Sequence, residues 1–420
     1  MLDLVGSAFS RKLFVEQDTL LLQTEGEIGG GFAMSNRCLL RIVTFLLVTA
    51  SPPALASPSE LEIVNIRIGQ GDATLVQGPA DPHGKRITVL FDAGDDADYD
   101  GSRIIAAVLS KRRIRHIDYV VISHYDADHI GGVITDRSRH GVSFLYGRDG
   151  VPGSVGDDDN DGKAEWVGVP DQRPDPEEFG TGDDITVGTF VDRGDEENKD
   201  TPQYRRYVEI ASAKGNRFSL DTQSKLNSFT IDLGGGASMV PLASSGRVRG
   251  AQSIVPNVDT ENERSVSMLV TFNKFDFLVS GDLIGRKHGA EDAQVERAVG
   301  QRIANDSRIV DVLHVNHHGA NNASDETFLE LIRPTIAVIS HGNVASYKHP
   351  NVNALARLEA ARVYRIIQTK WGTTDVSLSN TAIKNIQAIY QGDVVISSDG
   401  EEYTVSTSRT YRADTNPRRP

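Results

Sequence analysis

The feature that most constrains this chain is a cluster of histidines and aspartates directly after an apolar, strand-like run. Residues 119–122 read Tyr-Val-Val-Ile, and residues 123–132 read Ser-His-Tyr-Asp-Ala-Asp-His-Ile-Gly-Gly. Imidazole and carboxylate groups packed this closely are typical of a metal centre and rare in a plain polar turn. A tight loop can aim the first two ligands at one point and the last two at a neighbouring point, so we expect two metal ions. These four candidate ligands are His124, Asp126, Asp128 and His129.

Apolar patterns on both sides of this cluster predict a chain that alternates between strands and helices. The segment Leu61–Ile68 alternates as a half-buried strand does, and Phe275–Ser280 is a continuous apolar run. One predicted helix should be capped by Ser324, and the last should hold Pro350 in its first turn. We therefore expect an α/β fold. The predicted helices cover 102–109, 203–214, 293–303, 325–333 and 350–362; further strands are predicted at 87–91, 229–233, 238–242, 265–272, 309–315, 335–340, 394–397 and 402–405.

Three more candidate ligands follow later strands. Asp282 comes after a strand and a glycine, so its carboxylate can bridge two cations, whereas a turn aspartate is the alternative interpretation. His317 and His318 follow the strand predicted at 309–315. Because neighbours in an extended chain point to opposite sides, we expect one of these histidines to bind metal and the other to be a buried core residue.

Two aspartates and a further histidine are expected to act around the metal ligands. Asp92 ends a predicted strand and should accept a hydrogen bond that orients a ligand histidine; Asp72 could do the same, and both could equally be plain turn residues. His349, between Tyr347 and Pro350, is placed to contact substrate or to protonate a leaving group. A histidine that merely precedes a helix is the alternative.

Taken in order, these motifs resemble the metallo-β-lactamase superfamily. The pattern His-x-Asp-x-Asp-His at 124–129 is similar to its metal signature, with aspartate at 126 in place of the commoner second histidine. That aspartate indicates the branch that resembles the hydrolase domain of competence DNA-uptake proteins and phosphorylcholine esterase. The resemblance extends over roughly residues 61 to 400. Further matching segments are 69–72, 91–94, 280–282, 311–319 and 347–350.

The resemblance implies a four-layer αββα metallo-β-lactamase sandwich with two divalent metal ions, for which zinc is expected. It favours His318 over His317 as a ligand. It also implies hydrolysis by a hydroxide bridging the metals, with Asp128 holding both metal and water. The superfamily commonly has another ligand in a Gly-His-Thr segment, where this chain reads Asn-Glu-Arg-Ser at 262–265. Fewer nitrogen ligands on the His124 side would let that side accept manganese or iron.

The N-terminal region is predicted to be an extension followed by a cleaved export signal. Residues 37–57 contain a basic start, a short apolar run and the cleavage-like sequence Ala-Leu-Ala at 54–56. The apolar run is too short to cross a bilayer, so we expect no membrane span after cleavage and a periplasmic or secreted protein. Met34 stands directly before the signal and is the expected start of translation. The only cysteine, Cys38, would leave with the signal, which excludes a cysteine nucleophile in the mature chain.

The remaining chain is predicted to be one hydrolase domain over 57–408, with a surface insertion at 148–200 and a tail at 409–420. The insertion is rich in Gly, Pro, Asp and Glu. Within it, Asp157, Asp159 and Asp161 have the spacing of a calcium loop, but Gly168 stands where a bidentate acid belongs. A structural calcium ion and a solvated acidic loop both remain open.

Net charge bears on the substrate. The formal charge of −14 argues against a large basic surface for nucleic acid, although a local basic groove would still admit it. The family resemblance implies phosphodiester hydrolysis first, so we expect a small-molecule or phosphodiester substrate. The alternatives are a lactam, ester or thioester hydrolase of the same fold and a secreted binding protein without turnover.

Overall fold

The structure is a computed structural model. The residues that it describes are 59–95, 101–134, 145, 185–196, 200–213, 216–286, 294–342, 347–370, 388–389, 392–406 and 410–414. The predicted export signal with Met34 and Cys38 and the predicted calcium loop at 157–161 lie outside these residues.

One sheet is built mainly from the N-terminal half of the chain. Its strand order is β18-β17-β16-β1-β2-β3-β4-β5-β6, and the pairs β3–β4, β4–β5 and β5–β6 are parallel. The strands are β1 (Leu61–Asn65), β2 (Thr74–Gln77), β3 (Thr88–Phe91), β4 (His116–Val121), β5 (Thr186–Asp192), β6 (Arg217–Ser219), β16 (Val394–Ser398), β17 (Glu402–Val405) and β18 (Thr410–Arg412).

The second sheet comes from the C-terminal half. Its order is β15-β14-β13-β12-β11-β10-β8-β7, with β9 paired to β8. The pairs from β11 to β15 are parallel, and β10 and β11 form the hairpin that the sequence predicts. The strands are β7 (Ile231–Gly234), β8 (Ala237–Ser244), β9 (Arg247–Val248), β10 (Ser267–Phe272), β11 (Phe275–Val279), β12 (Val312–His314), β13 (Ile336–Ile339), β14 (Arg365–Gln368) and β15 (Ala388–Ile389).

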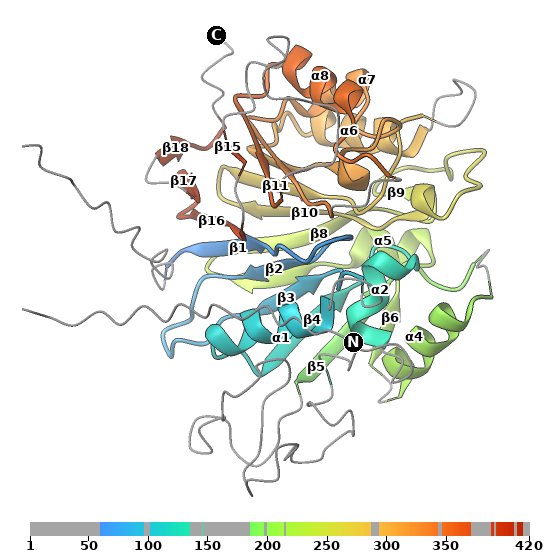
Figure 1. The fold of residues 1–420 in the computed structure, drawn as a ribbon, viewed down its shortest axis with the longest axis vertical. Helices are drawn as coiled ribbons and strands as arrows, with labels where there is room; N and C mark the ends of the chain where they lie inside the picture. The colour runs from blue at the N-terminus through green and yellow to red at the C-terminus, as the bar shows by residue number, and fades with distance from the viewer. Residues whose placement is uncertain are drawn as a thin grey trace, which may run out of the picture. The chain divides into compact units, whose positions relative to one another are not determined.

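Helices cover the outer face of each sheet, so the described residues from 59 to 414 form layers in the order helix, sheet, sheet, helix (Figure 1). Side chains from both sheets, such as Phe91 and Phe277, form the core between them. Two outer cores join each sheet to its helices. This mixed α/β architecture is consistent with the expected αββα sandwich. The helices are α1 (Gly101–Lys111), α2 (Ala127–Ile134) and α4 (Pro202–Ser212) on the first sheet, α6 (Gln294–Asn305), α7 (Glu326–Ile332) and α8 (Val352–Ala360) on the second, and the short α5 (Gln223–Ser228).

The domain boundaries predicted from composition need two corrections. The strand β5 lies inside the stretch 148–200 that was expected to be a surface insertion, and it pairs on both sides within the first sheet. The strand β18 lies inside the expected tail and pairs with β17. The strand β18 has three residues and β5 has seven, and the acidic or polar residues around both strands hide their apolar positions from an interpretation based on composition. The described part of the predicted insertion and tail thus belongs to the sheet.

Two helix starts also differ from the prediction. The N-cap of α7 is Asp325, whose side chain accepts a hydrogen bond from the backbone N–H of Phe328; Ser324 precedes it with a positive φ of 52°. The N-cap of α8 is Asn351, so Pro350 lies outside the helix. In both cases a side-chain oxygen that can reach a free N–H in the first turn decides where the helix begins.

The candidate residues gather at the carboxyl ends of strands from both sheets. Asp92 follows β3, the segment 123–129 follows β4, Asp282 follows β11, and the histidines at 317–318 follow β12. Within the described part of the chain, no helix has the length and apolar character needed to cross a membrane.

Candidate metal centre

The histidine–aspartate segment is fixed where β4 turns into α2. The backbone N–H of His129 bonds the Asp126 carbonyl at 3.0 Å, which places Asp128 and His129 in the first turn of α2. Gly71 packs directly against this turn, because a Cβ at Gly71 would lie 1.8 Å from the carbonyl oxygen of Asp128. The first glycine-containing motif of the sequence therefore serves to let its loop approach the metal-binding segment.

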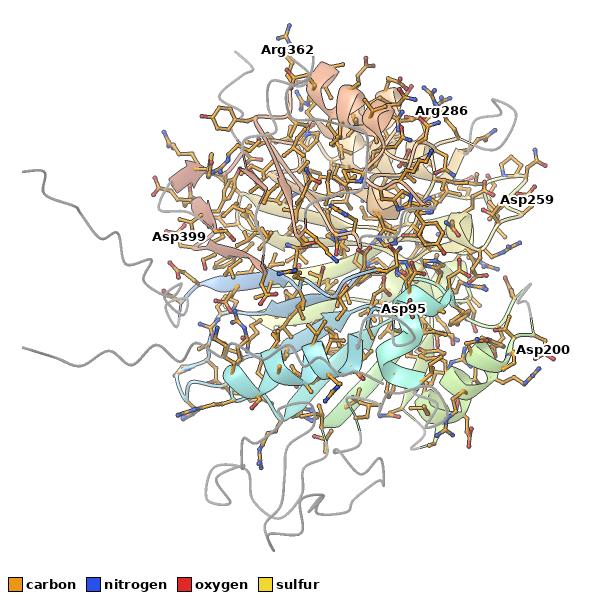
Figure 2. All side chains as sticks on the ribbon, in the orientation of Figure 1. Asp95, Asp200, Asp259, Arg286, Arg362 and Asp399 are labelled. Atoms are coloured by element: carbon orange, nitrogen blue, oxygen red, sulfur yellow. The ribbon has the colours of Figure 1, made fainter. Side chains whose placement is uncertain are left out.

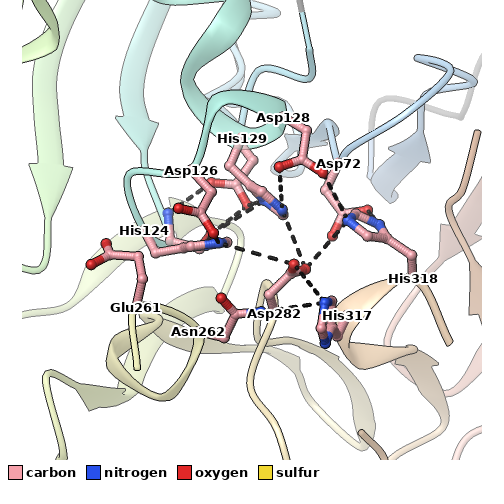
Figure 3. Close-up of polar contacts among 12 residues, drawn as sticks. Asp72, His124, Asp126, Asp128, His129, Glu261, Asn262, Asp282, His317 and His318 are labelled. Atoms are coloured by element: carbon pink, nitrogen blue, oxygen red, sulfur yellow. Dashed lines mark hydrogen bonds and ion pairs between the residues drawn. The ribbon is translucent and has the colours of Figure 1, made fainter. Parts of the chain in front are cut away.

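Asp282 lies at the middle of the site, with each carboxylate oxygen facing a different pair of histidines (Figure 3). Its Oδ1 is 3.2 Å from His129 Nε2 and 3.4 Å from His318 Nε2. Its Oδ2 is 3.5 Å from His317 Nε2 and 4.0 Å from His124 Nε2. A carboxylate placed between two sets of imidazole nitrogens has the geometry needed to serve two cations at once.

Asp126 and Asp128 extend these two sets on opposite sides. Asp126 Oδ2 is 3.6 Å from His124 Nε2. Asp128 Oδ2 is 3.4 Å from His318 Nε2, and its Oδ1 is 3.8 Å from His129 Nε2. Gln70 donates a hydrogen bond of 3.0 Å to Asp128 and so holds that carboxylate from behind. We call the group Asp128, His129 and His318 the closed side and the group His124, Asp126 and His317 the open side.

The polar atoms at the centre fit a metal ion because they are buried and lack other partners. The Nε2 atoms of His124, His129 and His318 and the Oδ1 atom of Asp282 are buried without a hydrogen bond. Buried polar atoms normally find a partner, and leaving several unpaired costs free energy. Their ligand atoms converge in groups, such as His124–His129–Asp282, whose members lie within 4.8 Å of one another. Nitrogen and carboxylate oxygen are also the donors that divalent zinc accepts.

Asp92 orients His129, as the sequence predicts for its position. Its carboxylate accepts hydrogen bonds from His129 Nδ1 at 2.9 Å and from the backbone N–H and hydroxyl of Ser123, both at 2.7 Å. The Nδ1 atom of His124 lies 2.9 Å from the same Ser123 hydroxyl. Holding Nδ1 of each ring leaves Nε2 facing the centre, which is how outer carboxylates usually prepare ligand histidines.

Both His317 and His318 face Asp282, so the expectation that one of them points into the core is wrong. That expectation assumed extended backbone, but their φ angles are 48° and 53°, in the left-handed region. The backbone N–H of His317 bonds the carbonyl of Gly281 at 3.0 Å, which ties this turn to the loop carrying Asp282. Two consecutive left-handed residues swing both rings to the same side.

The segment at 262–265, where the superfamily commonly has a further ligand histidine, contacts His317. Asn262 Nδ2 lies 3.3 Å from His317 Nε2, and Asn322 Oδ1 lies 3.1 Å from His317 Nδ1. His317 therefore lies beside the segment that lacks this histidine.

Several supporting residues were not identified from the sequence. Glu261 accepts hydrogen bonds from the backbone N–H of Tyr125 and from Nε and an Nη of Arg193, and it thereby joins the two loops beside His124. His314 is buried with its Nε2 atom 3.6 Å from Asp72. Asp72 itself lies 3.4 Å from His318 Nδ1, so its predicted place beside a ligand histidine agrees with the geometry. No sequence motif marks Arg193, because its partner Glu261 is distant in the sequence.

His349 lies next to the histidines of the centre and not among the atoms around Asp282. Its ring centroid is 5.7 Å from that of His317 and 5.8 Å from that of His318. Burial, together with the positive charge of these two neighbours, lowers the pKa of His349 to about 3. The ring is therefore neutral near pH 7, so the predicted leaving-group acid carries no extra proton at that pH.

The electrostatics of the closed side reflect the carboxylates around it. Burial disfavours the charged forms of His129 and His318, but Asp282 and the other carboxylates around them together raise the pKa of both well above the usual histidine value. Burial opposes ionisation of Asp282 too, yet His318 and His129 hold its pKa well below the usual range. On the open side, burial and then the charge of His318 lower the pKa of His317, although Asp282 acts in the opposite direction.

Comparison with known proteins agrees with this geometry. Residues 66–200 match the family model described as the metallo-beta-lactamase superfamily. The chain is 23% identical over 330 residues to ComE operon protein 3 of Bacillus subtilis, which covers 76% of this chain and 32% of that protein. It is 31% identical over 99 residues to Recombination protein 2 of Haemophilus influenzae, covering 23% of this chain and 11% of that protein. The chain thus spans about a third or less of the length of these relatives.

Solved structures with similar folds include the metallo-beta-lactamase fold protein YhfI from Bacillus subtilis, at 11% identity and a TM-score of 0.34 over 73% of this chain and 95% of that one. The protein Tm1679, described as a metal-dependent hydrolase of the beta-lactamase superfamily, is 14% identical at a TM-score of 0.37, over 73% of this chain and 95% of that one.

Proposed function

We propose that this chain, of which residues 66–200 match the metallo-beta-lactamase superfamily model, is a metal-dependent hydrolase that acts with two metal ions on phosphodiesters. The observation that carries the proposal is the position of Asp282, whose two oxygens face two separate pairs of histidines. With a single ion, one of these pairs would have no role at the centre.

The residues of the two sides would hold one ion each, with Asp282 shared. The donor sets would be Asp128, His129 and His318 on the closed side and His124, Asp126 and His317 on the open side. His317 joins the set because it faces the same oxygen of Asp282 as His124 does. We propose zinc for the closed side. The open side has one imidazole fewer than the common pattern and would also accept manganese or iron.

When bound, two such ions lower the pKa of water and stabilise negative charge on an attacked phosphoryl or carbonyl oxygen. The residues of the chain prepare this chemistry by fixing the ligands: Asp92 orients His129, and Gln70 holds Asp128. His349, with a neutral ring beside His317 and His318, would contact the substrate through hydrogen bonds. Because water would be the nucleophile, the proposed reaction requires no serine or cysteine nucleophile.

We favour phosphodiesters because the aspartate at 126 makes the centre rich in oxygen donors and because the motif order resembles the branch that cleaves them. Either a phosphorylated headgroup or nucleic acid would satisfy this chemistry, and the net charge of −14 disfavours long nucleic acids. The predicted leader at 37–57 supports export to the periplasm or the medium.

The test is a substrate panel with purified metal-loaded protein: bis-nitrophenyl phosphate, single-stranded DNA and nitrocefin. The proposal expects hydrolysis of bis-nitrophenyl phosphate, its loss after exhaustive chelation and its return with zinc or manganese. Cleavage of nitrocefin alone would favour a lactam hydrolase. Metal bound in full with no turnover of any ester would favour a secreted binding protein.

A further inference from the structure

Beside the metal centre, three rings stand in a row that leads outward. His318 faces Asp282, and its ring centroid lies 5.8 Å from that of His349 at an interplanar angle of 31°. The ring of His349 in turn lies 5.8 Å from that of Tyr347, nearly parallel at 21°. Tyr347 is therefore the outer member of a row that begins at a proposed ligand.

Tyr347 leaves much of its ring open to solvent. It is 56% exposed, and among the described residues only Ile254 and Val352 are other large hydrophobic side chains with comparable exposure. Both of those are aliphatic, so Tyr347 is the one large exposed aromatic ring in the described part of the chain. An aromatic surface next to a reaction centre is suited to stacking against a planar group of a substrate.

Lys348 adds a positive charge at the same place. It is exposed, and no ion pair with a carboxylate is found for it among the described residues.

We propose that Tyr347 and Lys348 form a substrate subsite for a planar aromatic group, such as a nucleobase, joined to the phosphate that enters the metal centre. Tyr347 stacks on the planar group, and Lys348 attracts the negative charge of the phosphate. A quaternary ammonium headgroup also binds aromatic faces, but the adjacent ammonium of Lys348 repels it. The inference rests on the proposed function and narrows its substrate to phosphate esters of the nucleotide type.

Binding measured by calorimetry tests the subsite without requiring turnover. The probes are thymidine 5′-monophosphate and methyl phosphate, titrated into the zinc-loaded full chain, because they share a phosphate and differ in the planar group. Wild type should bind the nucleotide about five- to hundredfold more tightly, the range that stacking of one base provides. Tyr347→Ala should remove this preference, Tyr347→Phe should keep it, and Lys348→Gly should weaken both probes by a similar factor.

Val352→Ala provides the matched control, since Val352 is an exposed apolar residue on α8 that takes no part in the row of rings. It should leave both affinities unchanged. Equal affinity of wild type for the two probes, or a preference that survives Tyr347→Ala, would overturn the subsite. Hydrolysis of bis-nitrophenyl phosphate, measured on the same samples, separates the two proposals: lost turnover with intact nucleotide preference overturns the function alone.

Discussion

The two sides of the metal centre differ in how far they are closed to solvent. On the closed side, the side chains of His129 and His318 are 0% and 1% exposed, and that of Asp128 is 23% exposed. On the open side, His124 is 0% exposed, His317 is 21% exposed and Asp126 is 52% exposed, so the contrast rests mainly on the two aspartates. The sequence gives both sides similar ligand types, so the difference arises from packing. The open side is therefore where a substrate can approach, and the closed side is where an ion is held most firmly.

The groups that hold the ligand histidines in place also differ between the two sides. Closed-side ligands are held by charged or backbone acceptors, since His129 bonds Asp92 and His318 bonds the carbonyl of Ser340 at 3.1 Å. On the open side, the hydrogen-bond partners of His317 among the described residues are the amide groups of two asparagines. A carboxylate or backbone carbonyl that accepts a hydrogen bond from a ligand histidine raises the basicity of that histidine and its affinity for metal. We expect weaker binding on the open side for this reason as well.

The largest effect should come from removing the residue that the two sides share. Asp282→Ala should lower activity by more than about a hundredfold and release metal from both sides, because its oxygens serve both sets of histidines. His349→Ala should retain both ions and lower turnover only. Metal content by mass spectrometry, set beside rates on bis-nitrophenyl phosphate, checks the pair. Equal metal loss in both variants would show that His349 is itself a ligand.

A second pair of variants separates the sides from each other. His318→Ala should abolish the tighter of two zinc-binding events, whereas His317→Ala should weaken only the looser one, by roughly tenfold or more. Competition titration with a coloured chelator resolves the two affinities. The asymmetry would be refuted if the two variants lost the same ion, or if wild type bound two ions with indistinguishable affinity.

Stability as a function of pH offers a smaller effect with a defined sign. Without metal, Asp282 raises the pKa of His129 and His318, so their stabilising charge is present below about pH 6.5 and is lost as pH rises. Bound metal requires neutral imidazole and is not lost in this range. The unfolding temperature of metal-free protein should thus fall relative to the zinc-loaded protein between pH 7 and 9.

The difference between the two samples is the quantity to measure by circular dichroism. Burial raises the pKa of Glu296 and of Asp311 to about 8, so both titrate in this window, but they do so with and without metal. Their contribution cancels in the difference. We expect the difference in unfolding temperature between the zinc-loaded and the metal-free protein to widen by roughly 2–4 °C for each kcal/mol of stability that the metal-free protein loses. A gap that stays constant or narrows would show that these histidines are not charged in the metal-free protein.

The smallest effect concerns metal choice on the open side. Asp126→His should tighten zinc there by a modest factor, because a nitrogen donor replaces a half-exposed carboxylate. Stepwise reconstitution with zinc and manganese would reveal it, and manganese should support activity better in wild type than in the variant. Identical metal preference in both proteins would mean that the aspartate does not influence metal choice.

How much of the site could be read from the sequence depends on the range of the interactions involved. The segment from His124 to His129 was identifiable because its four donors are close in sequence and follow a strand. Asp92 and Asp282 were predicted to lie near this segment for a related reason: aspartates at strand ends meet at one edge of the layers. Glu261 and Arg193 were missed, since their ion pair joins residues 68 positions apart and neither lies in a motif.

The sequence by itself indicated the candidate ligand types, the alternation of strands and helices, and the resemblance to the superfamily, because periodicity and motif spacing are local properties of the chain. Only the tertiary structure decided which atoms face each other. It turned His317 toward Asp282 through left-handed backbone that the loop at Gly281 supports, and it made β5 part of the first sheet despite its acidic surroundings. Such outcomes depend on contacts between distant segments, which compete with local preference and override it when burial and hydrogen bonding favour them.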